Sequence, residues 1–310
     1  MIPSGEHPFH GIYPSALLPL KSDYTIDEKA LVKHVSTLCD VPGVTGILCN
    51  AHAGENSRLD RDEQKRIVEI VCATVGKRAI VVAGVGNENT LEACAHARDA
   101  REAGCDAVII VAPNSWGISQ DDDIALIHHR MIIEAVDMPV MLFVGALNAG
   151  TLSYRPAVLE KLIRLPNIVG VKEGSYDTIR YEANRRLIKR IAPSVAVMAS
   201  ADQLLLPCYV LGSDGSQLSL ASVIPEPIVA LDRAVRADRL AEARRIHDRI
   251  YPLVDAIYGT PPGSRKNRRL KACLKLLGRF ENDLVRPPVG ELDPREISTL
   301  RQALQAAGAL

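Results

Sequence analysis

Lys172 is the residue of this chain whose chemistry its surroundings could change most. It closes a short apolar run at residues 168–172, and Glu173, Gly174 and Ser175 follow it directly. Lysine is rarely buried without a partner, and burial disfavours its ammonium form. A lysine held in this way can lose its proton near neutral pH and attack a ketone to form a Schiff base. The alternative is a lysine that snorkels to water or pairs with an acidic residue.

Histidines are the next candidates, because their charge changes near neutral pH. His52 lies in the segment 50–55, directly after an apolar run, and could act as an acid or a base. A structural histidine in a tight turn is the competing interpretation. His128 and His129 are adjacent within a helical pattern and have no carboxylate at metal-ligand spacing, so we expect surface histidines there and no metal site.

Two other motifs point away from cofactors and nucleic acid. Gly84-Val85-Gly86 is too short for a nucleotide-binding fingerprint, so a tight turn is predicted. The basic run at residues 265–269 opens a helix, and in a neutral chain it predicts a solvated or subunit-contacting face rather than a nucleic-acid site.

Short β-branched runs alternate with longer segments of helical periodicity, and these elements must position the candidates. Strands are predicted at residues 11–17, 44–50, 79–84, 106–111, 139–144, 168–172, 194–199 and 214–220. Helices are predicted between them, at residues 26–39, 61–75, 88–103, 121–136, 154–164, 177–191, 202–211 and 226–236.

Near-continuous apolar strands separated by helices indicate an α/β fold with a parallel sheet covered by helices. Eight such units in succession favour a closed (β/α)8 TIM barrel, and an open doubly wound sheet is the alternative. We assign residues 1–225 to the barrel and residues 226–310 to its last helix and a C-terminal helical extension, with helices at 226–258, 264–280 and 294–307. The carboxyl ends of barrel strands carry the chemistry, and Lys172 falls at one of them.

Composition limits the partners. The chain has 310 residues, with 37 basic and 37 acidic side chains, so no net charge draws it to nucleic acid or to an anionic membrane. No run approaches the roughly 18 apolar residues of a membrane span. The seven cysteines form no C-x-x-C pair and are expected to be reduced, packed thiols. Residues 1–8 lack the pattern of a signal peptide, so we predict a cytoplasmic protein.

Taken together, these segments resemble the dihydrodipicolinate synthase / N-acetylneuraminate lyase family of class I aldolases, over nearly the whole chain. Residues 168–173 resemble the family's Schiff-base strand, and residues 51–55 stand where the family has Gly-Thr-Thr-Gly-Glu. Residues 212–215 resemble the glycines before the eighth strand, and residues 270–278 the late helix. The resemblance implies a homotetramer of paired dimers and chemistry on 2-oxo acids through a lysine imine, without metal or organic cofactor.

Several positions depart from the family pattern. Phe143 stands where the family has the tyrosine that relays protons at the fifth strand. His52 and Ala53 replace the two threonines of the carboxylate loop. Ser115 replaces a second tyrosine, and Asn148 aligns with an arginine that often contacts the substrate.

These departures shape the expected function. We predict a lyase that forms an imine at Lys172 with a pyruvate-like 2-oxo acid or keto-deoxy sugar acid, with His52 as the replacement acid–base. The backbone near Ala53 is expected to bind the carboxylate, and Gln217, near the eighth-strand end, to add a polar contact. Because phenylalanine has no proton to give, dihydrodipicolinate synthase itself is not expected. The alternative is a catalytically retired aldolase scaffold that only binds such an acid.

Overall fold

Eight parallel strands form the centre of the molecule. The structure is a computed structural model that describes residues 9–118 and 122–310. Residues 1–8, which were compared with a signal peptide, and residue 121, the first of the helix predicted at residues 121–136, lie outside the described residues. The strands are β1 (Gly11–Pro14), β2 (Gly46–Cys49), β3 (Ile80–Val85), β4 (Ala107–Ile110), β5 (Val140–Val144), β6 (Ile168–Glu173), β7 (Ala196–Ala199) and β8 (Gly215–Leu218). All eight predicted strands are confirmed, with ends that differ by up to three residues.

The strands close into a ring. Their order is β1-β8-β7-β6-β5-β4-β3-β2, and every neighbouring pair is parallel. Isolated parallel bridges join β1 to the β2 segment, at Ile12–Val44 and Ser15–Leu48, and the Ala16 N–H donates to the Leu48 carbonyl at 2.8 Å. The closed barrel is therefore confirmed over the open sheet.

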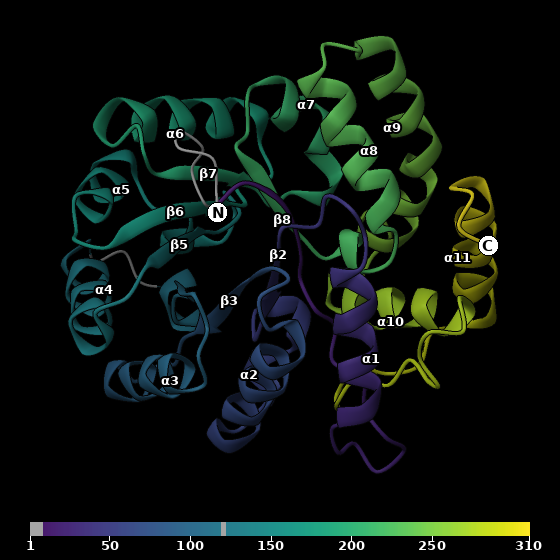
Figure 1. Cartoon of the computed structure of the whole chain (residues 1–310), viewed down its shortest axis with the longest axis horizontal. Coiled ribbons are helices and arrows are strands. Elements are labelled where there is room, and N and C mark those ends of the chain that lie inside the picture. Colours follow the sequence, from purple (N-terminus) through teal and green to yellow (C-terminus); the bar gives the residue numbers. More distant parts are fainter. Residues whose placement is uncertain (1–8, 119–121) are drawn as a thin grey trace.

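Helices surround the ring, as Figure 1 shows. They are α1 (Glu28–Cys39), α2 (Arg61–Val75), α3 (Thr90–Glu102), α4 (Asp122–Val136), α5 (Pro156–Ile163), α6 (Thr178–Ile191), α7 (Leu205–Val210), α8 (Pro225–Arg236), α9 (Leu240–Val254), α10 (Lys266–Leu276) and α11 (Pro294–Ala306). Helix α2 illustrates why they form. Asp60 and Glu63 make a reciprocal capping box at its start, and Ile67, Val71 and Val75 bury one face.

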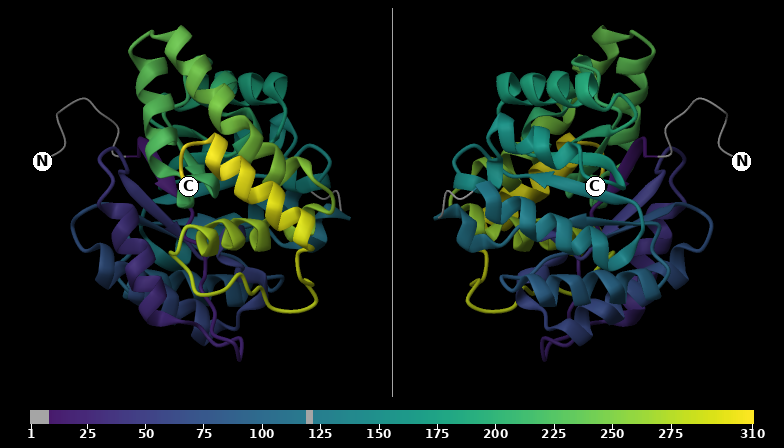
Figure 2. Two further views of the ribbon diagram at one scale, coloured as in Figure 1. Left: turned by 90° about the vertical axis from the view of Figure 1, so that its right-hand side faces the viewer. Right: turned by 90° about the vertical axis from the view of Figure 1, so that its left-hand side faces the viewer.

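The C-terminal region needs one correction. The helix predicted at residues 226–236 is confirmed as α8, but the continuous helix predicted at residues 226–258 is wrong. Helices α8 and α9 are separated at residues 237–239, where Asp238 adopts a left-handed conformation with φ 56°. A π-helical turn, Asp255–Gly259, follows α9. Helices α10 and α11 pack on the side of the barrel beside α9 (Figures 1 and 2).

Side chains alternate along each strand between the barrel interior and the surrounding helices. The interior cluster contains Tyr13, Leu48, Ile109, Met141 and Met198, with Phe143 packed against it. The intervening residues join a larger core between the strands and the helices. This alternation fixes which strand-end residues face the central cavity.

The turn expected at Gly84-Val85-Gly86 is wrong for Gly84 and Val85, which belong to β3; the strand predicted at residues 79–84 already included Gly84. A Cβ built on Gly84 would lie 2.1 Å from the Asn50 carbonyl oxygen, so glycine is required by the close approach of the segment after β2. No nucleotide-binding role is needed to explain it.

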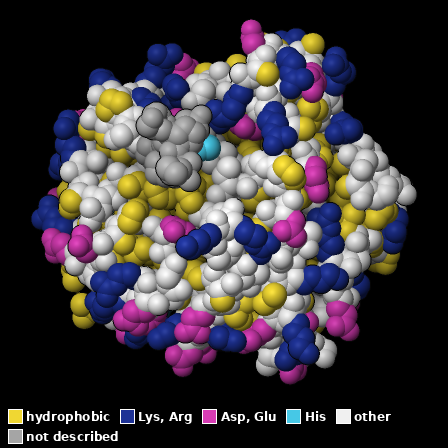
Figure 3. All heavy atoms as spheres, viewed as in Figure 1, with side chains coloured by type: hydrophobic (Ala, Val, Ile, Leu, Met, Phe, Trp, Pro, Cys, Tyr) yellow, Lys and Arg dark blue, Asp and Glu magenta, His cyan; other side chains and the backbone are white. Residues whose placement is uncertain are grey.

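Charge is spread over the surface and no membrane helix is present among the described residues. Figure 3 shows lysine and arginine side chains interspersed with aspartate and glutamate on the visible face. In the part of the chain that the structure describes, no helix is long and apolar enough to cross a membrane. All seven cysteines are free thiols, and five of them are buried.

Candidate active site

Lys172 lies on the inward side of β6 near its carboxyl end. It is opposite Phe143 of β5 and Met198 of β7 in the sheet register. The residue is only 8% exposed, and within residues 9–118 and 122–310 its ammonium makes no hydrogen bond or ion pair. Burial lowers the pKa of Lys172 to about 8, Asp202 opposes this effect, and Lys266 adds to it. Lys172 is therefore buried with a lowered pKa, and its role as the reactive amine stays a prediction.

The neighbouring Glu173 points the other way. Its carboxylate accepts hydrogen bonds from the Asn184 side chain at 2.9 Å and from the Ser175 hydroxyl at 3.1 Å. Burial raises its pKa. Because successive strand residues face opposite sides, Glu173 attaches the end of β6 to α6 while Lys172 stays unpaired in the interior.

A cavity of about 200 Å³ lies in front of Lys172. Of the residues predicted from sequence, it brings together His52, Ala53, Phe143 and Gln217 with the lysine. Its lining also includes residues that were not among the predicted site residues, among them Ser15, Tyr176, Asp202, Ser219, Lys266 and Asn267. The cavity therefore combines strand ends of the barrel with the start of α10.

His52 begins a single 3-10 turn, His52–Gly54, after β2. Its ring packs edge-on against Phe143, with centroids 5.3 Å apart. Burial lowers the pKa of His52 to about 4, and the charges of Lys172 and Lys266 lower it further. The imidazole is therefore neutral at pH 7, when it can accept a proton but carries none to donate as imidazolium.

Phe143 lies directly beside the lysine. The Lys172 Nζ is 5.1 Å from the centroid of its ring, which places the amine over the aromatic face. The ring supplies an apolar wall and no proton-transfer group. Any proton that moves at the amine must therefore use another side chain or water.

Gln217, from the inner face of β8, is almost fully buried. Its Nε2 lies 3.3 Å from the sulfur of Met141, while its Oε1 has no hydrogen-bond partner among the described residues. Ser15 Oγ and Asn267 Oδ1 are also buried and unpartnered in this sense. Three residues that line the cavity thus each have a buried polar atom without a partner among the described residues.

Two predicted residues lie away from this cavity. Ser115 is exposed, and its hydroxyl donates to Glu88 at 2.5 Å. Asn148 is exposed in the loop after β5. The structure does not bring either residue into contact with the space in front of Lys172, and their roles in substrate binding stay predictions.

Asp202, directly after β7, is the buried acidic side chain of the cavity. It accepts hydrogen bonds from the Leu220 N–H at 2.8 Å and from the Ser219 hydroxyl at 3.3 Å. Tyr258, from the π-helical turn, also bonds to Asp202 and lies 2.8 Å from Ser219 Oγ. Burial raises the pKa of Asp202, whereas these bonds and Lys172 oppose the effect. A buried carboxyl group whose pKa is raised thus lines the same cavity as the amine.

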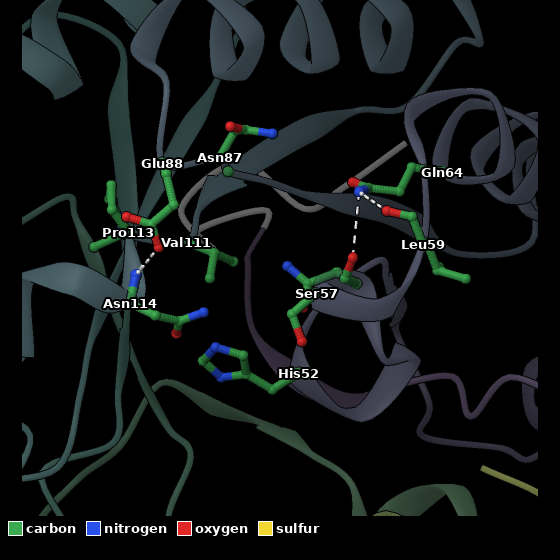
Figure 4. A pocket seen from close by; sticks show the side chains of 12 residues that line it. His52, Ser57, Leu59, Gln64, Asn87, Glu88, Val111, Pro113 and Asn114 are labelled. Carbon is green, nitrogen blue, oxygen red and sulfur yellow. Dashed lines mark hydrogen bonds between the residues drawn. The ribbon is translucent and has the colours of Figure 1, made fainter. Parts of the chain in front are cut away.

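A second pocket of about 190 Å³ is also lined by His52. Figure 4 shows the imidazole at its edge, with Asn114 and Ser57 nearby and Glu88 accepting from the Asn114 N–H. Gln64 crosses the far wall and donates to the carbonyls of Asn56 and Leu59. His52 therefore lines both this polar pocket and the cavity of Lys172.

Helix α10 holds the His52 turn in place. Asn267 donates from Nδ2 to the His52 carbonyl at 2.8 Å. One helical turn later, Lys271 forms a fully buried ion pair with Glu55 and donates to the Leu284 carbonyl at 2.6 Å. The C-terminal extension is thus part of the site.

Two surface predictions are wrong. His128 and His129 are buried in α4, where His128 bonds to Thr90 and His129 to Tyr154, and Trp116 packs against them. The basic run at 265–269 is also largely buried, because its arginines pair with acidic residues of the following segments. In the described parts of the chain, no group of three or more His, Cys, Asp or Glu residues is arranged to hold a metal ion.

Comparison with known proteins adds an independent observation. The sequence profile described as "Dihydrodipicolinate synthetase family" matches residues 8–307. The chain is 31% identical to a 4-hydroxy-tetrahydrodipicolinate synthase of Methanothrix thermoacetophila, over 96% of each chain. It is 30% identical to a protein of the same name from Endomicrobium trichonymphae, over 97% of this chain and 99% of that one.

Solved structures agree in fold. The crystal structure of a dihydrodipicolinate synthase from Aquifex aeolicus superposes with a TM-score of 0.86 at 25% identity, and covers 97% of this chain and 99% of that one. YagE, a prophage protein from E. coli of the dihydrodipicolinic acid synthase family, was solved in complex with pyruvate. It superposes with a TM-score of 0.88 over 97% of this chain and 99% of its own, and at 24% identity that likeness shows the fold alone.

Proposed function

The chain belongs to the dihydrodipicolinate synthetase family, whose members are class I aldolases and lyases, and on that premise we propose that it is a lyase acting on a 2-oxo acid through an imine at Lys172. The observation that carries the proposal is the buried amine of Lys172, unpaired among the described residues and with a pKa of about 8, at a cavity of about 200 Å³. At pH 7 roughly a tenth of such an amine is neutral, compared with less than a thousandth at an ordinary lysine pKa.

The proposed chemistry balances without a metal or organic cofactor. The neutral amine attacks the ketone carbon, and the carbonyl oxygen leaves as water with the two protons of the amine. Uptake of one further proton then gives the protonated imine. In aldol cleavage the imine carbon is C2 of the 2-oxo acid, and the bond between C3 and C4 breaks. The electron pair of that bond moves into the imine to give an enamine. Dehydration and condensation use the same electron sink.

Proton transfer is assigned to the groups that line the cavity. Phe143 cannot take part, and His52 is neutral at pH 7, so it can act as the base that removes a substrate hydroxyl proton. Asp202, whose pKa burial raises, is suited to exchange a proton with the lysine during imine formation. The backbone near Ala53 and the side chain of Gln217 remain the proposed polar contacts.

The substrate is proposed to be pyruvate-like or a keto-deoxy sugar acid. The unpartnered Ser15 Oγ, Gln217 Oε1 and Asn267 Oδ1 favour a ligand with hydroxyl groups, because an oxygen acceptor without a donor is unfavourable when buried. Dihydrodipicolinate synthase activity itself is not proposed, although curated relatives carry that name, because Phe143 lacks the relay hydroxyl. We further propose a cytoplasmic homotetramer that binds neither nucleic acid nor membrane.

Reductive trapping tests the proposal. The protein is incubated with pyruvate or another 2-oxo acid and cyanoborohydride, and the adduct is located by peptide mass spectrometry. One adduct is expected, at Lys172, and it should be lost in Lys172→Met but kept in the exposed control Lys161→Met. The absence of any Lys172 adduct across a panel of 2-oxo acids would reject imine chemistry.

The second candidate is a retired aldolase that binds a 2-oxo acid without turnover. It is favoured by the phenylalanine at 143 and by the position of Ser115 outside the cavity. This candidate predicts an adduct or ligand-induced thermal stabilisation, but no cleavage, dehydration or exchange of substrate protons. Turnover that disappears in His52→Ala, with adduct formation retained, would reject it.

A further inference from the structure

Lys266 differs from the other basic side chains at the start of α10. Three of the four form ion pairs: Arg265 and Arg269 with Glu296 at 3.0 and 2.8 Å, and Arg268 with Asp283 at 3.2 Å. Lys266 makes no ion pair or hydrogen bond with any residue that the structure describes, although it is half-buried. The acidic side chains of this region are thus taken up by its neighbours.

The unpaired lysine lines the same cavity as Lys172. Its charge is close enough to add to the effect of burial on the pKa values of both Lys172 and His52. It is also the first residue of α10, where the helix dipole is positive, and no acidic residue lies in that first turn. A cation at this position is unfavourable unless an anion binds there.

Asp202 is close enough for the Lys266 charge to lower its pKa, but the two side chains form no ion pair. Its two carboxylate oxygens already accept from Leu220 and Ser219, it bonds to Tyr258, and burial disfavours its charged form. In a cavity with one buried amine and a second, half-buried cation, a small anion is the missing component. Lys172, more than nine-tenths buried, also presents to this space an amine that has no partner in the described chain.

We propose that Lys266 binds the carboxylate of the 2-oxo acid while Lys172 holds its ketone carbon as an imine; this inference rests on the proposed function. Asn267 links the first turn of α10 to the His52 carbonyl, so Lys266 lies beside the turn that carries Ala53. A carboxylate bound between the Lys266 ammonium and that turn lies in the same cavity as Lys172. Lys266 would then select 2-oxo acids over neutral ketones.

The test compares a charged with a neutral ligand. Labelling of Lys172 by cyanoborohydride is followed against the concentration of pyruvate or of its neutral amide, pyruvamide, at pH 9, where a change in the pKa of Lys172 has little effect. Lys266→Met should raise the pyruvate concentration for half-labelling on the order of 10- to 100-fold and leave that for pyruvamide unchanged. Lys266→Arg should recover part of the loss.

Lys275→Met is the matched control. It removes one positive charge from the same helix, at an exposed position that does not line the cavity, and it should behave like the unaltered protein. Circular dichroism and thermal unfolding establish that each variant is folded. Equal pyruvate dependence in Lys266→Met and the unaltered protein, or equal weakening of pyruvate and pyruvamide, would overturn the inference.

Two further arms separate its failure from other failures. If Lys266→Met spares pyruvate but weakens 2-oxoglutarate, the lysine binds a distal carboxylate and the inference is overturned, while imine formation stands. If the unaltered protein forms no adduct, the proposed function fails. Whether Lys266 binds the carboxylate is then tested separately, by the stabilisation that pyruvate gives in thermal unfolding. If pyruvate stabilises the unaltered protein and Lys275→Met but not Lys266→Met, carboxylate binding by Lys266 is supported. If pyruvate stabilises none of these proteins, or all of them equally, carboxylate binding by Lys266 is rejected.

Discussion

Replacing Lys172 by methionine should stabilise the protein at pH 7, because the fold holds this amine away from water. Burial lowers the pKa of Lys172 from 10.5 to about 8. That difference corresponds to about 3 kcal/mol of folding free energy, at about 1.36 kcal/mol for each pH unit. Methionine is similar in length and uncharged, so the variant does not bear this desolvation penalty.

The direction of the pH dependence is fixed by the lowered pKa. Above pH 10.5 the amine is neutral in both states, and the folded state has its full stability. As the pH falls, the unfolded chain takes up the proton first and the folded state loses stability, until the folded lysine is also protonated near and below pH 8. The advantage of Lys172→Met is therefore about 3 kcal/mol at pH 7 and only about 2 kcal/mol at pH 9.

Urea unfolding of the unaltered protein and Lys172→Met at pH 7 and pH 9 measures both quantities. Lys161→Met, at an exposed position of α5, serves as the control and should change stability little at either pH. A variant that is no more stable at pH 7, or whose advantage is the same at both pH values, would show that the amine is solvated or ion-paired. Lys172 would then not be the dry amine that imine formation at neutral pH requires.

Three other outcomes are expected. Lys271→Met leaves Glu55 buried without its cation, so it should lower the free energy of unfolding by about 3–5 kcal/mol in urea titrations, with partial recovery in the double variant with Glu55→Gln; a loss below about 1 kcal/mol would contradict a buried pair. The rate of pyruvate trapping should rise with pH around a midpoint near 8, set by the lowered pKa of Lys172, and a midpoint near 10 would refute that pKa. Phe143→Tyr places a hydroxyl close to the amine, so the loss of pyruvate methyl protons in deuterium oxide, followed by NMR, should accelerate by about 10²-fold; an unchanged rate would show that proton transfer does not limit the reaction.

The barrel was predictable because its signal is local. Each strand is a short apolar run between turn residues, and the helices between them repeat at 3.6 residues. The position of Lys172 near the carboxyl end of a strand was predictable for the same reason, since the strand and the residues after it are contiguous in sequence. The break between α8 and α9 was missed because it depends on one left-handed residue, Asp238, which has no strong sequence signature.

The helical spacing of residues in α4 indicates that its two histidines are buried. Ala125, His128, His129, Ile132, Ile133 and Val136 follow helical spacing and are all buried. The prediction placed both histidines at the surface because they are polar, although they continue this buried face of the helix. The partners that satisfy the two rings, Thr90 and Tyr154, lie 38 and 25 residues away, so no local spacing reveals them.

The basic run shows a different limit. Its arginines are neutralised by Asp283 and Glu296, which lie 15 to 31 residues further along the chain. Local composition therefore indicated a solvated face, whereas tertiary pairing buries it. The same limit hid Lys266 and Asn267 from the predicted site, because only the folded structure brings the start of α10 to the strand ends.

The C-terminal extension consequently contributes to the candidate site, even though the proposed division at residue 225 places it outside the barrel. Asn267 and Lys271 hold the His52 turn from the same helix that supplies Lys266. A shift of α10 would move the neutral imidazole and the unpaired cation together, relative to an amine fixed on β6. The balance of charge around Lys172, and with it the fraction of reactive amine, is therefore set by helix packing as well as by the strand that carries it.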